Sequence, residues 1–272
     1  MIHPTAIIHP SAKLHESVSV GPYAVIEGPA EIGEGCTVAS HTIIGGHVVM
    51  GRANTIGHGA LIGGDPQDLA FRPAVKSRVV IGDGNNIREY VTIHRGTQDG
   101  TETLVGNGCF LMAGAHLAHN VHLGSHVILA NNVLLGGHVH AGDRVFIGGG
   151  SAVHQHIRIG SHAICQGLSV ISKDVPPFVM AAGRNGVVGL NIIGLRRNGF
   201  TVAQRAEIKS AFDLLYRSGK NVSQALAAAE GQTWTDAGRL FWAFVAATKK
   251  KGICAWIGTG RNRDARDEHE AE

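Results

Sequence analysis

Residues 111–135 read LMAGAHLAHNVHLGSHVILANNVLL, with a leucine at every sixth position. The same six-residue spacing of aliphatic residues continues on both sides of this stretch. It begins with eleven consecutive positions in residues 2–62, resumes in residues 81–93, and runs on through residues 105–171. Of 26 such positions, 24 hold Leu, Ile, Val or Met. Chance spacing in an aliphatic-rich chain does not account for so long a run.

A period of six matches neither the 3.6-residue period of an α-helix nor the 2-residue period of a single strand. It suits a short strand followed by a corner, where glycine or asparagine supplies unusual backbone angles. The composition agrees, with 38 glycines and only 5 % aromatic residues. Three such faces close a coil of 18 residues, and coils stack about 4.8 Å apart. We therefore predict a mainly β fold, with a parallel β-helix over residues 1–184.

Two polar segments interrupt the repeat, and both are predicted to be external loops. They cover residues 64–78 and 96–104. Loops on a rigid scaffold often carry function.

The repeat stops after Asp174-Val175-Pro176-Pro177, and residues 185–272 are predicted to form a small α-helical C-terminal domain. Thr201 and Gln204 form a capping-box pattern that starts a helix ending at Tyr216. Weaker helical patterns follow over residues 222–229 and 235–250. The charged tail from about residue 261 is predicted to be flexible.

Cellular location and partners can be partly inferred from composition. The N-terminus has no signal-peptide pattern, and no apolar stretch is long enough to span a membrane. The four cysteines are widely separated, as is typical of a reducing compartment, so we expect a soluble cytoplasmic protein. Residues 189–263 hold twelve Lys or Arg against four Asp or Glu. This excess indicates either a solvated helical surface or a docking face for an acidic partner, and no nucleic-acid motif accompanies it.

Histidines concentrate in one part of the β-helix. Nine of the seventeen lie in residues 116–162. With 18 residues per coil, His119, Gly137 and Gln155 fall in one column on consecutive coils. Asn120, His138 and His156 fall in the neighbouring column. A histidine column beside a glycine is a candidate site, since the glycine N–H could face a ligand.

Several longer strings resemble a known enzyme family. They are Gly64-Asp65-Pro66-Gln67-Asp68-Leu69, Ile87-Arg88-Glu89, Val91-Thr92-Ile93-His94-Arg95-Gly96-Thr97, Ala115-His116-Leu117-Ala118-His119, Ile128-Leu129-Ala130-Asn131-Asn132, Ala152-Val153-His154-Gln155 and 191–200 (NIIGLRRNGF). On these strings the chain resembles the UDP-N-acetylglucosamine 3-O-acyltransferases, which start lipid A assembly. The resemblance implies a left-handed coil and a homotrimer with sites between subunits. It also implies acyl carrier protein as donor, UDP-N-acetylglucosamine as acceptor, and no cofactor or metal.

The resemblance also implies roles for particular residues. His119 would be the general base toward the sugar 3-hydroxyl, and the Gly137 N–H would bind the oxyanion. Gly167 would limit the acyl length. Contacts to the substrates would come from Gln67, Asp68, His116, His138, His154 and Gln155, and contacts to the nucleotide from Asn191 and Arg197. From the basic excess of the helical region, and not from the resemblance, we expect carrier docking to involve Arg196, Arg197, Lys209 and Arg217.

The chain departs from the family pattern at four positions. Asn120 stands where an aspartate commonly follows the catalytic histidine, and Ala70 stands where lysine is frequent. Ile193 replaces an acidic residue and Asn198 an arginine. These departures leave open an acceptor with a 3-amino group in place of the hydroxyl.

Three other functions remain open on the sequence. A zinc-dependent hydrase of the carbonic anhydrase type could use His116, His119, His122 and His138. A β-helix without catalysis would favour uniform Thr or Asn ladders, which are absent from the sequence. The related N-acyltransferase of the same pathway carries a separate domain before its coils, whereas the repeat here begins at Ile2.

Overall fold

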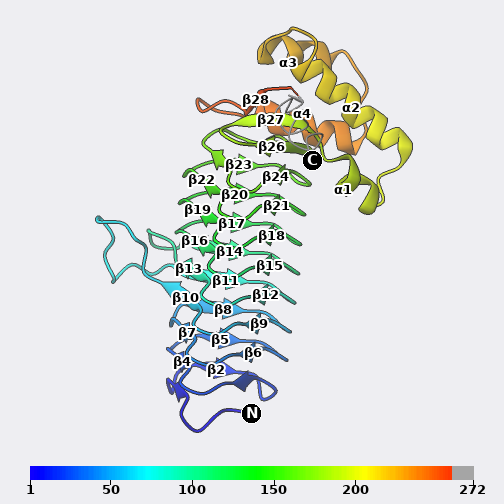
Figure 1. The fold of residues 1–272 in the computed structure, drawn as a ribbon. Coiled ribbons are helices and arrows are strands. Elements are labelled where there is room, and N and C mark those ends of the chain that lie inside the picture. The colour runs from blue at the N-terminus through cyan, green and yellow to red at the C-terminus, as the bar shows by residue number, and fades with distance from the viewer. Residues whose placement is uncertain (259–272) are drawn as a thin grey trace, which may run out of the picture.

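The computed structural model describes residues 1–258, which form a three-sided parallel β-helix followed by four α-helices. Figure 1 shows the coils stacked in a column, with the helices gathered at its C-terminal end. Along the coils, each side of the column is a parallel sheet in which every third strand of the chain is a neighbour. The hexapeptide period therefore predicted the architecture.

The strands of the three sheets have the following bounds. The first sheet contains β1 (Ile7–Ile8), β4 (Val25–Ile26), β7 (Ile43–Ile44), β10 (Leu61–Gly64), β13 (Thr92–His94), β16 (His116–Leu117), β19 (Leu134–Leu135), β22 (Ala152–Val153) and β25 (Val170–Ile171). The second contains β2 (Lys13–Leu14), β5 (Glu31–Ile32), β8 (Val48–Met50), β11 (Arg78–Ile81), β14 (Glu102–Val105), β17 (His122–Leu123), β20 (His140–Ala141) and β23 (Arg158–Ile159). The third contains β3 (Ser19–Val20), β6 (Thr37–Val38), β9 (Thr55–Ile56), β12 (Asn86–Ile87), β15 (Phe110–Leu111), β18 (Ile128–Leu129), β21 (Phe146–Ile147), β24 (Ile164–Cys165), β26 (Val179–Ala182), β27 (Gly186–Leu190) and β28 (Ala255–Trp256).

The residues of the six-residue period point inward and form the core. Leu117 of one coil pairs in register with Leu135 of the next, and both side chains are fully buried. Burying one such side chain stabilises the fold by about 1.5–3 kcal/mol. Stacked aliphatic ladders of this kind fill the prism, so it needs few aromatic rings.

The chain turns at three corners, which position the candidate site residues. Corner 1–2 joins the first and second sheets at residues 118–121, 136–139 and 154–157 of consecutive coils. Corner 2–3 includes residues 142–145 and 160–163, and corner 3–1 includes residues 148–151 and 166–169. At corner 1–2, Asn120, His138 and His156 take left-handed φ angles of 59°, 59° and 62°. The sharp turn requires this conformation, which asparagine and histidine adopt more readily than most side chains.

The last strands and the helices cap the column. The strands β26 and β27 form an antiparallel hairpin, and β28 returns to pair with β27. The helices are α1 (Ile192–Arg197), α2 (Val202–Tyr216), α3 (Val222–Glu230) and α4 (Asp236–Ala246). The predicted capping box of α2 is present, with Thr201 and Gln204 bonded reciprocally.

The boundary placed between residues 184 and 185 falls in the turn of the β26–β27 hairpin and stays a prediction. The tail predicted from about residue 261 lies outside the described residues. Among residues 1–258, no helix has both the length and the apolar character needed to cross a bilayer.

Candidate active site

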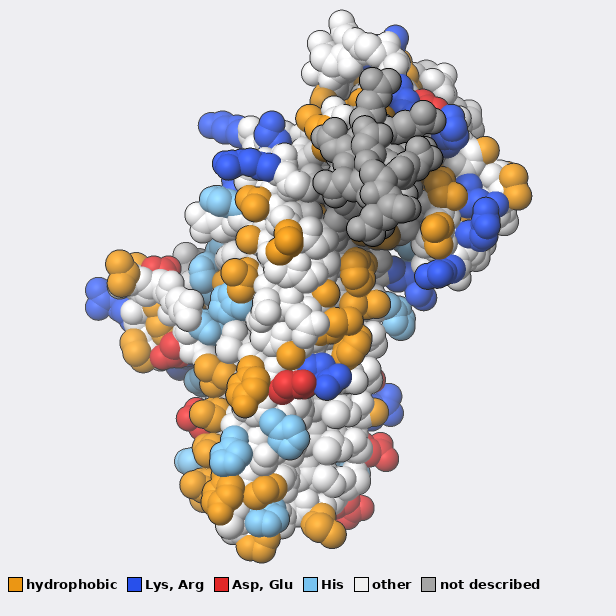
Figure 2. All heavy atoms as spheres, viewed as in Figure 1, with side chains coloured by type: hydrophobic (Ala, Val, Ile, Leu, Met, Phe, Trp, Pro, Cys, Tyr) orange, Lys and Arg blue, Asp and Glu red, His pale blue; other side chains and the backbone are white. Residues whose placement is uncertain are grey.

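The predicted histidine column forms at corner 1–2. The His138 N–H donates to the carbonyl oxygen of His119 at 3.0 Å, and the His156 N–H donates to that of Gly137 at 2.9 Å. These bonds hold three consecutive coils in register, so that His119, Gly137 and Gln155 stack as the 18-residue period predicts. Figure 2 shows histidine side chains gathered between the external loop and the body of the β-helix.

The ring of His119 lies directly over Gly137. A Cβ atom on Gly137 would be 2.5 Å from Cε1 and 2.6 Å from Nε2 of His119. Any side chain at position 137 would therefore displace the imidazole. Within residues 1–258, the Gly137 N–H donates to no protein acceptor. The glycine thus places an available donor beside the imidazole.

Asn120 fixes the protonation pattern of His119. Its Oδ1 atom accepts from the Thr97 N–H at 3.2 Å and from the Thr97 hydroxyl at 3.1 Å, and lies 3.0 Å from His119 Nδ1. A backbone N–H can only donate, which identifies this atom of the amide as its oxygen. Nδ1 of His119 must then donate the remaining bond. The hydrogen-bond network therefore assigns the proton to Nδ1 and leaves the Nε2 lone pair free.

Two further imidazoles continue from His119 along the corner. The rings of His119 and His138 meet edge to face with centroids 5.2 Å apart, and the His138 and His156 rings stack at 4.5 Å. Burial lowers the pKa of His138, and the neighbouring histidines lower it further. Burial likewise lowers the pKa of His156, so both rings favour the neutral form, which donates and accepts hydrogen bonds without adding charge.

A hollow of about 670 Å³ opens from this corner onto the first sheet. Its polar lining includes Gln67, His116 and His154, and its apolar floor includes Leu134 and Val170. The structure thus brings three of the predicted substrate contacts together. A hollow with an apolar floor and a few polar groups suits a small ligand that has both an apolar and a polar part.

The sequence did not single out His94, which packs against His116 in the lining of this hollow. Its ring meets that of His116 edge to face at 5.1 Å, and only 5 % of the residue is exposed. Its Nδ1 atom has no hydrogen-bond partner within residues 1–258. Burial, reinforced by His116 and His119, lowers the pKa of His94 to about 4. His94 follows directly after Ile93, the inward-facing residue of its strand. This position in the repeat was the signal in the sequence that could have identified His94.

Gln67 and Asp68 lie on the external loop between β10 and β11. The Asp68 carboxylate is exposed and accepts from the Ala70 N–H at 2.9 Å. This bond shapes the loop locally, at the position where lysine was expected. The structure places Gln67 in the hollow but gives Asp68 no contact with the histidine column.

Arg95, which is 4 % exposed, organises the base of this loop. Its guanidinium donates to Asp65 at 2.9 Å and to the Pro73 carbonyl oxygen at 2.9 Å, and stacks over the Phe71 ring at 4.9 Å. A buried guanidinium needs several partners, and the loop supplies them.

The predicted nucleotide residues are not beside His119 in the same chain. Asn191 begins α1, and its side chain donates to the His162 carbonyl oxygen at corner 2–3. Arg197 is exposed at the end of that helix. Figure 1 accordingly shows α1 on the other side of the column from the external loop. A site that uses both groups requires more than one chain.

The remaining expected residues are also spread over the corners. Gly167 is exposed at corner 3–1. Asn198 ends α1 and accepts from Arg144 at 2.8 Å, which fastens this helix to corner 2–3. Ile193 is 67 % exposed on α1. Within residues 1–258, no three His, Cys, Asp or Glu side chains are arranged to hold a metal ion.

This fold and corner define a hexapeptide-repeat transferase. The bacterial transferase hexapeptide family model matches residues 11–46 and 102–137, and the model for domain 2 of UDP-N-acetylglucosamine O-acyltransferase matches residues 174–254. A curated relative is the acyl-[acyl-carrier-protein]–UDP-N-acetylglucosamine O-acyltransferase of Paraburkholderia phymatum. It is 49 % identical over 226 residues, which cover 82 % of this chain and 86 % of the relative.

Solved structures agree. The UDP-N-acetylglucosamine acyltransferase of Francisella novicida matches with a TM-score of 0.90 and 37 % identity over 94 % of each chain. LpxA of Acinetobacter baumannii matches with a TM-score of 0.88 and 38 % identity over 93 % of this chain and 98 % of that one. The chain belongs to the UDP-N-acetylglucosamine O-acyltransferase family. The predicted family is confirmed, and with it the left-handed parallel β-helix and small helical C-terminal region.

Proposed function

We propose that this protein transfers an (R)-3-hydroxyacyl group from acyl carrier protein to the 3-hydroxyl of UDP-N-acetylglucosamine, the first step of lipid A biosynthesis. Family membership supports the acyl transfer and both substrates, since the curated relative carries them in its name. The observation that carries the mechanism is the free Nε2 of His119 beside the available N–H of Gly137.

The chemistry follows from these two groups. His119 Nε2 takes the proton from the sugar 3-hydroxyl as its oxygen attacks the thioester carbonyl carbon. The carbonyl oxygen becomes negative and accepts a hydrogen bond from the Gly137 N–H. The intermediate collapses by breaking the carbon–sulfur bond, and the imidazolium returns its proton to the departing thiolate. The imidazole is thereby regenerated.

The apolar floor of the first-sheet hollow supports an acyl chain as part of the ligand. Leu134 is 50 % and Val170 47 % exposed in the single chain, although both are large and apolar. His116 and Gln67 at its polar rim would contact the sugar, with His154, Gln155 and His138 nearer the column. His116 is oriented by Thr92, whose hydroxyl lies 2.7 Å from Nδ1.

The active unit in this proposal is a homotrimer with sites between subunits. Asn191, Arg197 and Gly167 lie at corners that a single chain keeps away from His119. The third sheet supplies an apolar outer stripe for packing, formed by Phe110, Ile128, Phe146 and Ile164. Such stripes on a protein surface commonly mark interfaces. Sedimentation that shows a monomer at micromolar concentration would contradict the shared site.

The proposed location is the cytoplasm. All four cysteines are buried and free, as is usual in a reducing compartment.

Mass spectrometry of reaction products tests the function. Purified protein would be incubated with 3-hydroxyacyl carrier proteins of several chain lengths and with either UDP-N-acetylglucosamine or its 3-amino analogue. We expect an ester product from the first acceptor. Exclusive amide formation with the second would move the assignment to a 3-amino sugar, and no acyl product from either would refute acyl transfer.

A further inference from the structure

A second hollow lies on the opposite side of corner 1–2, between the second sheet and the segment that follows α4. Its volume is about 910 Å³. The hollow is lined by His138, His140, His156, Arg158, Asp174, Ala247, Lys249, Lys250 and Lys251. We call it the basic hollow. In Figure 2 a group of Lys and Arg side chains protrudes directly above the histidine face.

Within residues 1–258, the three lysines carry charge that no neighbouring carboxylate balances. In the part of the chain that the structure describes, the one carboxylate lining the hollow belongs to Asp174, which pairs with Arg158 at 2.6 Å. Among residues 1–258, no carboxylate oxygen lies within 4.0 Å of Lys249, Lys250 or Lys251. The hollow therefore has a strong positive potential even when its histidines are neutral.

Basic residues elsewhere in the helical region are differently placed. Lys209 and Arg217 on α2 both pair with Asp213, at 2.5 and 3.1 Å. These two residues were expected to contribute to carrier docking, but their charge is partly neutralised within the chain. The lysine cluster is the stronger attractor for an anion.

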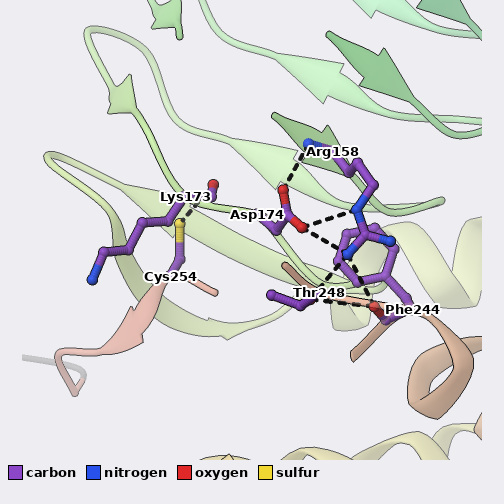
Figure 3. Close-up of polar contacts among 6 residues, drawn as sticks. All are labelled: Arg158, Lys173, Asp174, Phe244, Thr248 and Cys254. Carbon is purple, nitrogen blue, oxygen red and sulfur yellow. Dashed lines mark hydrogen bonds and ion pairs between the residues drawn. The ribbon is translucent and has the colours of Figure 1, made fainter. Parts of the chain in front are cut away.

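The chain on both sides of the cluster is tied to the last coil, as Figure 3 shows. Before the lysines, Arg158 donates to the Phe244 carbonyl oxygen at 3.2 Å and to the Thr248 hydroxyl at 2.9 Å. After them, the Asp174 N–H donates to the Gly252 carbonyl oxygen at 3.0 Å, and its carbonyl oxygen accepts from the Cys254 N–H at 2.8 Å. The lysines thus stand on a short, anchored segment, which lowers the ordering cost of binding a ligand.

Lys251 reaches the histidine column itself. Its Nζ atom donates to the Gln155 carbonyl oxygen and lies 3.1 Å from Nδ1 of His154. Burial lowers the pKa of His156, and the charge of Lys251 lowers it further. The basic hollow and the hollow with an apolar floor on the first sheet therefore lie on the two sides of the same corner.

We propose that Lys249, Lys250 and Lys251 form a phosphate-binding site for one of the two reactants. This inference rests on the proposed function and adds a substrate-binding subsite to it. Both reactants carry phosphate: the acceptor has a pyrophosphate, and the carrier's prosthetic arm is attached through a phosphodiester. Lysine ammonium groups bind phosphate as point charges and can serve either geometry.

Steady-state kinetics of lysine variants test the site. The double variant Lys249→Gln/Lys250→Gln removes two exposed charges and leaves the Lys251 contacts in place, so its folding is preserved. Lys251→Gln removes the third. Lys13→Gln is the matched control, because Lys13 is an exposed lysine paired with Glu31 near the other end of the column. We expect KM for one reactant to rise roughly tenfold in the cluster variants, as for loss of a charge-assisted bond, with the control unchanged.

Two small-molecule acyl donors identify which reactant's phosphate is bound. Wild-type protein and the double variant would be assayed with acyl-4′-phosphopantetheine and with acyl-pantetheine, which lacks the phosphate. If the donor phosphate occupies the site, wild type prefers the phosphorylated donor and the variant loses that preference. If the pyrophosphate occupies it, KM for UDP-N-acetylglucosamine rises instead. Unchanged KM values with retained donor preference would overturn the inference, whereas absence of product from wild type would refute the acyl transfer itself.

Discussion

The Asn120 side chain connects the proposed base His119 to Thr97, which lies in the second external loop (residues 96–104). An aspartate at this position would accept the same hydrogen bonds and would add a negative charge. Asparagine keeps the orientation of the His119 ring through its amide oxygen and omits the charge. The departure at position 120 thus preserves the tautomer needed for a base and changes only the electrostatics around it.

Asn120→Asp therefore gives a specific kinetic prediction. The carboxylate would stabilise the imidazolium form of His119, as a nearby opposite charge does. We expect the acidic limb of the kcat/KM profile to move to higher pH, with the fold unchanged.

His119→Ala should lower kcat by about 10²–10⁴-fold, the usual contribution of proton transfer. A superimposable pH profile in folded Asn120→Asp would contradict the pairing, and normal turnover in His119→Ala would contradict the base.

His94 predicts a loss of stability in acid. Its pKa is lowered by burial to about 4 in the folded protein, against about 6.5 for an unperturbed histidine. As pH falls below about 6.5, the unfolded chain takes up a proton that the folded chain does not. This uptake leaves the free energy of unfolding unchanged above that pH and lowers it progressively between about pH 6.5 and 4. The total decrease, set by the difference between the two pKa values, is about 3 kcal/mol.

Chemical unfolding at a fixed protein concentration and several pH values measures this effect. His94→Leu should flatten the dependence of the free energy of unfolding on pH in that window, whatever its absolute stability. His47 is exposed, so His47→Gln supplies the control and should keep the wild-type slope. A slope unchanged by His94→Leu would mean that partly buried histidines with lowered pKa values, such as His116 and His162, dominate the acid response.

The strands and corners follow from the sequence because their spacing repeats, whereas the loops and the cap do not repeat. An 18-residue period suffices to stack His119, Gly137 and Gln155, and a capping box suffices to begin α2. Thr97 could not be linked to Asn120 in the same way, because the path of an external loop has no period. The return of β28 to pair with β27 is likewise a contact between segments of unrelated pattern.

Gly167 at corner 3–1 gives a prediction about acyl length. A Cβ atom here would lie 3.3 Å from the Gly149 carbonyl oxygen, so a side chain fits after a small shift and projects from the corner. In Gly167→Met the side chain would occupy space otherwise filled by methylenes, each worth about 0.8 kcal/mol when buried. We expect kcat/KM to shift toward shorter 3-hydroxyacyl donors. Gln166→Met, on the adjacent exposed residue, should not shift it, and an unchanged preference in Gly167→Met would place the limit elsewhere.

The three corners together explain why the proposed site needs more than one chain. His119 and Gly137 occupy corner 1–2, Asn191 is fastened to corner 2–3, and Gly167 lies at corner 3–1. A convex prism cannot bring its own corners together. Parallel packing of identical prisms can do so, since it sets a corner of one subunit against a different corner of the next. Sequence reasoning assigned these residues to one site by resemblance, while their separation within the chain follows from the coil.

Mixed trimers test this arrangement directly. His119→Ala removes the proposed base from corner 1–2, and Arg197→Glu places a repelling charge at the end of α1 near corner 2–3. Each variant alone should have little activity at a low concentration of UDP-N-acetylglucosamine. In trimers assembled at random from equal amounts of both, about one quarter of the interfaces would join an intact His119 to an intact Arg197 of the neighbouring subunit. We therefore expect co-refolded or co-expressed mixtures to recover about one quarter of wild-type activity. Separately purified variants mixed without subunit exchange form the control and should recover none. If both groups acted within one chain, no mixed trimer would contain an intact site, and activity would stay at the level of the parent variants.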